Sequence, residues 1–357
     1  MVLVLFFVTN LQPFIDATSQ VPCYFIFGDS EFDCGNNNGF TKASKSNYPP
    51  YGIDFPDGPT GRFTNGRTQA DLIGQFLGFD NFIPPFANTS GQDILKGVNY
   101  ASGGGGILNE TGKTLGDRIS MDMQLQNHET TIKGISNLLG SSGAAESYLA
   151  SCIYLVGMGS NDYINNYLLP ESYNSSQLYT PNMYATILAQ NYAQQLRTLY
   201  NFGARKVAIV GLGLIGCALP EIVLHDTNIF TCAGNCVTKD AEVFNIQLKS
   251  LVDQLNNDLL NANFIYINVS GITTTYLAAD AKSGVTLKYG PCCNTDLIVG
   301  RAECIPNSVP CSNRTMYKFW DAFHTTEVVN ILLAKGMYNA QTPFDAYPFD
   351  IVRLALL

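Results

Sequence analysis

The stretch "IFGDSEFDCGNNNGF", from Ile26 to Phe40, changes character abruptly in its middle. The apolar run Tyr24–Phe27 has the length and composition of a buried strand. It ends at Gly28, Asp29 and Ser30, and further acids and three consecutive asparagines follow. Small polar residues in this place are typical of a tight turn. A serine at the mouth of a sheet is also where a nucleophile would lie, if the fold supplies a base.

Further strand-like runs alternate with helical patterns along the chain. The runs rich in β-formers are Gly97–Ser102, Cys152–Gly159, Lys206–Gly213 and Asn263–Val269. Apolar residues at three- and four-residue spacing predict helices over Met183–Tyr200, Ala241–Leu260 and Thr326–Met337. This alternation predicts βαβ units and a parallel sheet covered on both faces. Ligands of such sheets bind beyond the carboxyl ends of the strands, so we look for chemistry there.

Each of the first three predicted strands ends in groups that suit acyl transfer. The first ends at Ser30, the second runs into "SGGGGI" and the third into "GSNDY". They offer a hydroxyl, glycine amides and a carboxamide. Each alone has a commoner explanation, as a turn, a glycine loop without the lysine of a phosphate-binding loop, or a helix cap. Their occurrence at successive strand ends favours one shared site.

The base has three candidates, His128, His225 and His324. Asp321 precedes His324 by three residues, a spacing that can place carboxylate and imidazole on one side of a turn. The other two histidines have their acidic neighbour in the next position, where side chains diverge. His128 also lies in a polar helical pattern, for which we predict a solvated surface role. His324 is therefore the candidate base.

Taken together, these segments resemble the plant GDSL esterase/lipase family of the SGNH hydrolases. "FGDSEFDCGNNN", "GVNYASGGGGI", "GSND" and "DAFHTTE" are similar to the four sequence blocks of that family. The similarity extends to "GRFTNGRT", "GLGLIGCALP" and "YGPCC", and covers nearly all of the chain from residue 22. It implies a three-layer α/β/α, flavodoxin-like fold with a five-stranded parallel sheet, and hydrolysis of carboxylic esters.

The resemblance also implies roles for single residues. Ser30 matches the nucleophile, and Asp321 and His324 match the other members of a catalytic triad. The oxyanion hole would be formed by the backbone amides of Ser30 and Gly103 and by the side chain of Asn161, the choice of glycine being uncertain by one residue. No metal ion or organic cofactor is implied. The partner would be a small-molecule or lipid ester.

Two positions depart from the family pattern. Glu31 follows the nucleophile where the family usually has an aliphatic residue, and it puts a negative charge beside the reacting centre. Thr325 follows His324 where the family usually has proline, which removes some rigidity near the base. Neither change removes a catalytic group. An α/β-hydrolase is the rival enzyme, but its G-x-S-x-G elbow would need glycine at Phe32.

Two other functions share the same residues. One is a secreted binding or defence protein that keeps the fold with weak catalysis, an alternative that Glu31 keeps open. The other is a transacylase, in which a sugar or lipid hydroxyl replaces water in the second half-reaction. Labelling by a fluorophosphonate would separate an activated serine from an inert one.

The composition predicts a globular domain with a sizeable core. The chain has 357 residues, of which 46% are hydrophobic, and we predict one domain over residues 20–357. The formal net charge is −9 and the basic residues are scattered, so nucleic acid is not an expected partner. The oligomeric state cannot be deduced from these features.

The first residues, "MVLVLFFVTNLQPFIDATSQ", have the pattern of a secretory signal. Ala17 and Ser19 would occupy the −3 and −1 positions of a cleavage before Gln20. The run is shorter than the roughly 20 apolar residues that span a bilayer, so we favour a signal over residues 1–19 to a retained anchor or a buried strand. Five N-x-S/T sequons agree with secretion to the extracellular space, at Asn88, Asn109, Asn174, Asn268 and Asn313.

The chain has ten cysteines, several of them clustered. Zinc binding is one interpretation, but no histidine lies among the clusters and the paired CxxC spacing is absent. In a secreted chain disulfides are the better prediction. We expect most of one set to be bridged, with the last four paired within their own segment: Cys217, Cys232, Cys236, Cys292, Cys293, Cys304 and Cys311.

Overall fold

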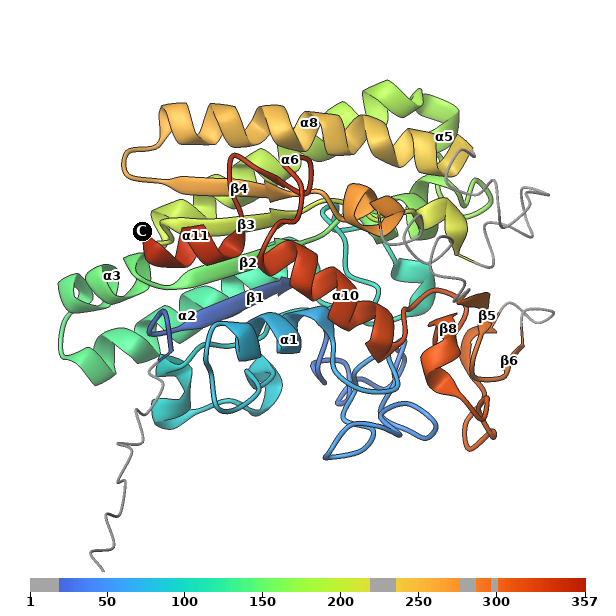
Figure 1. The fold of residues 1–357 in the computed structure, drawn as a ribbon. Helices are drawn as coiled ribbons and strands as arrows, with labels where there is room; N and C mark the ends of the chain where they lie inside the picture. The colour runs from blue at the N-terminus through green and yellow to red at the C-terminus, as the bar shows by residue number, and fades with distance from the viewer. Residues whose placement is uncertain (1–18, 219–235, 276–286, 297–300) are drawn as a thin grey trace, which may run out of the picture.

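A five-stranded sheet runs through the centre of the protein (Figure 1). The computed structural model describes residues 19–218, 236–275, 287–296 and 301–357. The strand order is β1-β2-β3-β4-β9, and the first four strands are parallel. These are β1 (Tyr24–Gly28), β2 (Ile153–Gly157), β3 (Lys206–Val210) and β4 (Asn263–Ile267). The last strand, β9 (Ala346–Tyr347), pairs antiparallel with β4.

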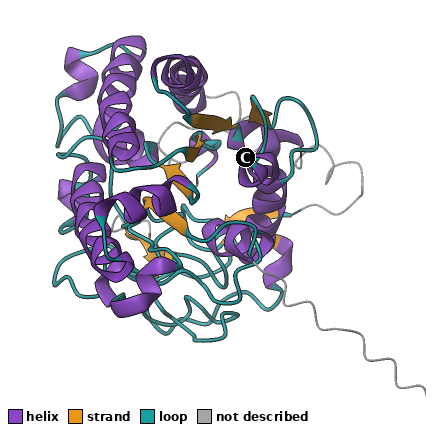
Figure 2. Cartoon of the chain, turned by 90° about the vertical axis from the view of Figure 1, so that its left-hand side faces the viewer, coloured by secondary structure: helices purple, strands orange, loops and turns teal. Residues whose placement is uncertain are grey.

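Helices cover both faces of this sheet, which gives three layers (Figure 2). One face packs against α2 (Met121–Leu139), α3 (Ser142–Ala150), α6 (Pro181–Asn201) and α8 (Cys236–Asp258). The other packs against α1 (Gln69–Phe76), α10 (Glu327–Tyr338) and α11 (Ile351–Leu356). The predicted three-layer α/β fold is thereby confirmed, and α6, α8 and α10 lie where helices were predicted.

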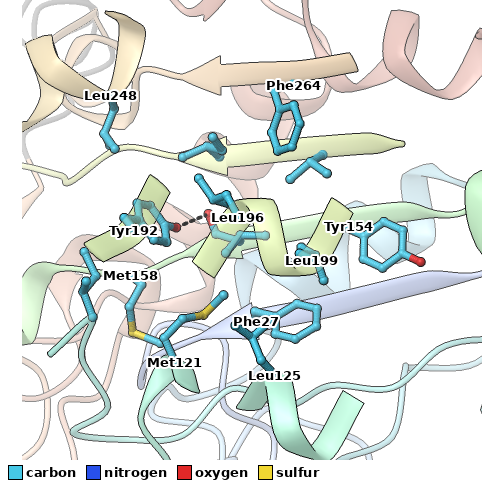
Figure 3. Packing of buried hydrophobic residues seen from close by; sticks show 14 of the residues in the cluster. Phe27, Met121, Leu125, Tyr154, Met158, Tyr192, Leu196, Leu199, Leu248 and Phe264 are labelled. Carbon is cyan, nitrogen blue, oxygen red and sulfur yellow. Dashed lines mark hydrogen bonds between the residues drawn. The ribbon is translucent and has the colours of Figure 1, made fainter. Parts of the chain in front are cut away.

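The two faces of the sheet are separate apolar cores because successive side chains of a strand point in opposite directions. In β1, Phe25 and Phe27 belong to the core under α2 and α6, whereas Tyr24 and Ile26 belong to the other. Figure 3 shows the first core, where Phe27 lies close to Leu125 of α2. Each such fully buried aromatic side chain stabilises the fold by roughly 1.5–3 kcal/mol.

The helices that flank the sheet begin at residues suited to capping. α1 starts with a capping box, in which the Thr68 hydroxyl accepts from the Asp71 amide and the Asp71 carboxylate accepts from the Thr68 amide. α6 follows Thr180, whose hydroxyl accepts from the amide of Met183, and has Pro181 in its first turn. These caps satisfy amides that the helix itself leaves unpaired.

The sheet differs from the predicted five parallel strands in one respect. Gly97–Ser102, the predicted second strand, lies along the free edge of β1 with only an isolated bridge between Ile26 and Asn99. Alternate backbone bonds still join it to β1, such as Tyr100 N to Ile26 O at 2.8 Å and Ser102 N to Gly28 O at 3.0 Å. The fifth assigned strand is instead the short antiparallel β9.

Two small sheets and two disulfides organise the segment before α10. β5 (Lys288–Pro291) pairs with β8 (Tyr317–Phe319), and β6 (Thr295–Asp296) pairs with β7 (Arg301–Cys304). Cys292 is bonded to Cys311 and Cys293 to Cys304. The prediction that these four cysteines pair within their own segment is confirmed, and zinc binding by them is excluded.

Other cysteines differ in outcome. Cys217 is also disulfide-bonded. A bond between Cys23 and Cys152, which was not predicted, joins the residues just before β1 and β2. Cys34 is free and buried. Four features of the sequence lie outside the described part of the chain: Cys232, the side chain of Cys236, His225 and residues 1–18 of the predicted signal over residues 1–19.

Short elements complete the chain. They are η1 (Phe86–Asn88), η2 (Gly91–Leu95), η3 (Lys113–Leu115), α4 (Ser160–Asp162), η4 (Tyr163–Tyr167), α5 (Ser175–Leu178), η5 (Ile215–Cys217) and η8 (Arg314–Met316). None of the helices in the described ranges is long and apolar enough to span a membrane.

Candidate active site

Ser30 lies in a tight turn directly after β1. The Asp29 carbonyl accepts hydrogen bonds from the amides of Phe32 and Asp33, at 3.2 and 3.0 Å, which reverses the chain within four residues. Phe32 then folds back beneath the strand ends, where a Cβ on Gly28 or Gly157 would lie within 2.6 or 2.3 Å of its ring. The two glycines therefore permit the turn that presents Ser30 at the carboxyl end of the sheet.

Three side chains from the two ends of the chain form a hydrogen-bonded series. His324 Nε2 lies 2.8 Å from Ser30 Oγ, and His324 Nδ1 lies 2.7 Å from Asp321 Oδ2. Asp321 is fully buried and His324 is 9% exposed. With Nδ1–H donated to the carboxylate, Nε2 is the acceptor for the serine hydroxyl. This arrangement can remove a proton from Ser30.

The charge on His324 is set by its carboxylate neighbours. Burial lowers the pKa of His324, but the Asp321 charge and hydrogen bond, with the charges of Glu31 and Glu303, together raise that pKa to about 9. Asp29, which directly precedes Ser30, is also buried, and burial raises its pKa to about 6. These carboxylates stabilise the imidazolium that forms when His324 takes a proton, whereas only the neutral ring can act as the base.

The loop that carries Asp321 and His324 is held from several sides. The Asp321 carboxylate accepts from the amides of Phe323 and His324, at 2.9 and 2.7 Å, and from the Tyr51 hydroxyl at 2.6 Å. Thr325, at the position where the family usually has proline, donates to Asn330 Oδ1 at 2.6 Å, and its carbonyl accepts from the Thr64 hydroxyl at 2.9 Å. These bonds hold the loop without the proline.

Asn161, at the start of α4, lines the same cavity as His324 and is 7% exposed. Its Nδ2 donates one hydrogen to the Gly105 carbonyl at 2.9 Å, and its Oδ1 accepts from Asn165 Nδ2 at 2.6 Å. The two bonds fix the orientation of the carboxamide. The second hydrogen on Nδ2 is therefore available to a ligand in the cavity.

Among the described residues, a glycine-loop amide without a hydrogen-bond partner lies one residue after the expected Gly103. The Gly103 amide donates to the buried Asp33 carboxylate at 2.9 Å, so it is already paired. Gly104 lines the cavity with Ser30 and Asn161, and its amide has no hydrogen-bond partner among the described residues. Gly104 has φ +79°, a conformation that favours glycine.

These groups open into a cavity of about 580 Å³ at the carboxyl ends of the parallel strands. Aliphatic and aromatic side chains from both halves of the protein make up most of its lining, among them Leu115, Ile164, Leu169, Leu212, Val269, Phe319, Val329 and Leu333. The polar reacting groups thus lie at one place in a largely apolar chamber, as in most sites that bind small organic ligands.

Glu31 also lines this cavity and is half-buried. Its carboxylate accepts from Gln69 Nε2 at 3.1 Å. Burial, with smaller effects from the neighbouring acids, raises the pKa of Glu31 to about 7, although the His324 charge opposes the rise. The residue does not begin a helix, since residues 30–32 form a turn.

The structure brings together Ser30, Asp321, His324 and Asn161, as the sequence predicted for a shared site. The surface role predicted for His128 is wrong, because that side chain is fully buried in α2. Sequence reasoning also missed Tyr51 and Asp33. Only the local pattern around Asp33, a carboxylate followed by glycine and asparagines, signalled a turn there.

Comparisons with known proteins identify the family of this chain. The family model described as GDSL-like Lipase/Acylhydrolase matches residues 24–337. A GDSL esterase/lipase of Arabidopsis thaliana is 48% identical over 341 residues, which cover 96% of this chain and 93% of its own. A second from the same plant is 47% identical over 343 residues, covering 96% and 94%. Among solved structures, a Bacillus subtilis protein matches 88% of this chain and 54% of its own at 11% identity, with a TM-score of 0.34 that is too low to bear on the fold. On the family match and these relatives, the chain belongs to the GDSL-like lipase/acylhydrolase family.

Proposed function

We propose that this protein is a secreted serine esterase that hydrolyses carboxylic esters through an acyl-enzyme. The observation that carries the proposal is the series Ser30, His324 and Asp321, with hydrogen bonds of 2.8 and 2.7 Å, at the edge of an apolar cavity. Family membership supports the same reaction, since the two plant relatives described above are named esterase/lipases.

The reaction begins with proton transfer. His324 Nε2 takes the hydroxyl proton as Ser30 Oγ attacks the ester carbonyl, and Asp321 stabilises the imidazolium that forms. The developing oxyanion accepts hydrogen bonds from the amides of Ser30 and Gly104 and from Asn161 Nδ2. His324 then gives the proton to the departing alcohol. Water repeats these steps on the acyl-enzyme and releases the acid.

The oxyanion donors in this proposal differ from the sequence expectation at one position. Gly104 takes the place of Gly103, because the Gly103 amide is bonded to Asp33. The three donors come from different parts of the protein: one is a backbone amide of the nucleophile turn, one belongs to the glycine loop and one is a side chain of α4. Preorganised donors of this kind stabilise the transition state more than the bound ester.

The test is labelling of the active serine. A fluorophosphonate should label the wild-type protein at Ser30, and Ser30→Ala should lose both the label and nearly all turnover of a p-nitrophenyl ester. Thermal unfolding should be unchanged within a few degrees. A folded Ser30→Ala variant that keeps a tenth of wild-type activity would overturn the assignment. Labelling without turnover on any ester would favour the binding-protein alternative, and turnover that needs an added alcohol would favour transacylation.

Secretion and glycosylation form part of the proposal. Three disulfides among described residues are supporting observations, since such bonds persist in oxidising compartments. Four sequon asparagines are exposed, namely Asn88, Asn109, Asn174 and Asn313. Asn268 is half-buried and its Nδ2 donates to the Phe344 carbonyl at 3.1 Å, so we expect it to be the least modified. Glycosidase treatment and mass spectrometry of protein from a plant culture medium would test this order.

A further inference from the structure

Three asparagines follow the nucleophile turn, and they contact different parts of the molecule. Asn36 Nδ2 donates to the carbonyls of Asn99 and Ala101, at 2.9 and 2.7 Å. Asn37 contacts the glycine loop, whereas Asn38 Nδ2 donates to the Thr60 carbonyl at 2.8 Å. Asn36 and Asn37 are buried, with 4% and 2% exposure. None of the three is needed for the chemical steps proposed above.

Asn37 holds the peptide that carries the Gly104 amide. Its Nδ2 donates to the Gly103 carbonyl at 2.9 Å and to the Ser44 carbonyl at 3.0 Å. Its Oδ1 accepts from the Ser102 hydroxyl at 2.5 Å, and that hydroxyl in turn accepts from the Ile119 amide at 2.9 Å. These partners fix which end of the carboxamide faces Gly103, because only the amide nitrogen can donate to a carbonyl.

Because a peptide bond is planar, the contact between Asn37 and the Gly103 carbonyl also sets the direction of the Gly104 amide. The carbonyl of residue 103 and the amide of residue 104 belong to one planar unit, and in a trans peptide they point in opposite directions. Holding the Gly103 carbonyl toward Asn37 therefore turns the Gly104 N–H away from Asn37. Gly104 itself lines the cavity beside Ser30 and Asn161.

The preceding peptide is held in the same way by a charge. The Asp33 carboxylate accepts from the Gly103 amide at 2.9 Å and from the amides of Gly35 and Asn36 at 2.8 and 2.9 Å. Asp33 and Asn37 thus hold two successive peptides of the glycine loop, and both lie on the segment that follows Ser30. The nucleophile and the Gly104 amide are connected through buried bonds only.

We infer that Asn37 is a positioning residue for the oxyanion hole: it sets the direction of the Gly104 amide relative to Ser30 without touching the substrate. The inference rests on the proposed function. A glycine at positive φ resists rotation less than any other residue, so an external restraint is what keeps this donor oriented. Asn37 therefore acts on the transition state and leaves ester binding nearly unchanged.

The test compares two neighbouring asparagines. Asn37→Ala removes the bond to Gly103, while Asn38→Ala removes a partly buried bond to Thr60 and leaves the glycine loop untouched. For Asn37→Ala we expect kcat to fall about 10- to 100-fold, less than the loss of a whole donor. KM should stay within about threefold, and the acid limb of the pH profile should not move, because His324 keeps its partners. Asn38→Ala should keep kcat within about threefold of the wild-type value. Unfolding should be measured for all variants.

A second readout separates positioning from general loosening. A trifluoromethyl ketone forms a tetrahedral adduct with Ser30 and places an oxyanion in the hole, whereas the product acid binds as a ground-state ligand. In Asn37→Ala the inhibition constant of the ketone should rise by the same factor as kcat/KM falls, and that of the acid should not change. If Asn37→Ala does not fold, Ser102→Ala keeps the carboxamide and removes only the hydroxyl that orients it, with a several-fold fall in kcat expected.

Three results would overturn the inference. They are equal losses in the Asn37 and Asn38 variants, a rise in KM at unchanged kcat, and an unchanged inhibition constant for the ketone. Failure of the proposed function looks different, because the wild-type protein itself would then lack fluorophosphonate labelling and ester turnover. If the wild-type enzyme is active and either Asn37→Ala or a folded Ser102→Ala keeps full kcat, this inference is wrong and the proposed function stands.

Discussion

His324 and His128 are both buried, but their surroundings give them opposite properties. His324 has the Asp321 carboxylate 2.7 Å from one nitrogen and a serine 2.8 Å from the other. Among the described residues, His128 has the Tyr100 hydroxyl at 3.0 Å from Nδ1 and no hydrogen-bond partner for Nε2. Rings of Phe25, Phe27 and Tyr154 surround it, among others.

The difference appears in the charge of the two rings. Burial lowers the pKa of His128 to about 3, since nothing beside it offsets the loss of water. The same burial acts on His324, and the Asp321 carboxylate reverses its effect to give a pKa of about 9. One ring is kept neutral and inert, while the other is ready to carry a proton. The carboxylate partner, and not burial, distinguishes His324, the proposed base, from the structural His128.

Removing that partner should have the largest effect. Asp321→Asn keeps the size of the side chain but reverses the tautomer preference of His324, because an amide nitrogen would face Nδ1. We expect kcat to fall by about 10⁴-fold, the usual cost of this change in a serine triad. Single-turnover and steady-state kinetics on a p-nitrophenyl ester would measure it. A loss below tenfold in a folded variant would show that Asp321 does not orient the base.

His128 should affect stability and leave chemistry alone. Burial lowers its pKa in the folded chain to about 3 from the ordinary value of 6.5, so below pH 6.5 the unfolded chain binds a proton that the folded chain does not. The free energy of unfolding therefore falls as the pH falls, by up to about 1.4 kcal/mol per pH unit. His324, with a raised pKa, contributes in the opposite sense: its stabilisation is complete below pH 6.5 and is lost toward pH 9.

The variant His128→Gln isolates this contribution. The amide can still bond the Tyr100 hydroxyl but does not titrate. Between pH 7 and pH 4.5 the variant should lose about 2–3 kcal/mol less stability than the wild type, while kcat stays within about twofold. Urea unfolding at several pH values measures the slopes, and the buried acids common to both proteins cancel. Parallel slopes would mean that His128 is not neutral in the fold.

The sequence carried a signal for His128 that depends on position and not on residue type. The buried residues of α2 include Met121, Leu125, His128 and Ile135, which follow the spacing of one helix face. The polar neighbours of His128 concealed this stripe. Judged by its place on this helix face, and not by its residue type, His128 would have been predicted to lie in the core.

Other features were unreadable for physical reasons. β9 has two residues, too few to show a period, and the Cys23–Cys152 bond depends on β1 and β2 being adjacent, with Tyr24 opposite Ile153. The proposed catalytic series could be predicted because Asp321 and His324 lie on one turn. Gly104 could not, since consecutive glycines look alike until Asp33 is seen to occupy the Gly103 amide.

Replacing Glu31 should have the smallest effect among these variants. It tests how much a second carboxylate adds to the difference in pKa between His324 and His128. The Glu31 carboxylate is one of the charges that raise the pKa of His324. At about 7 Å and an effective dielectric of about 40, one such charge is worth roughly 1 kcal/mol. Replacing it should lower the His324 pKa by less than about one unit.

The expected result of Glu31→Leu follows from this decrease in the pKa of His324. A lower His324 pKa lets the neutral imidazole persist to lower pH, so the acid limb of kcat/KM should move downward. Where the base is mostly protonated, kcat/KM on a neutral ester should rise, but less than about tenfold. Because burial raises the pKa of Glu31 itself to about 7, its charge is absent at lower pH, and the variant and wild type should converge below about pH 6.

Glu129→Gln, on the exposed face of α2 beside Lys133, is the matched control and should leave the pH profile of kcat/KM unchanged. If the two profiles coincide at every pH, water screens Glu31, and His324 owes its charge to Asp321 and its other neighbours.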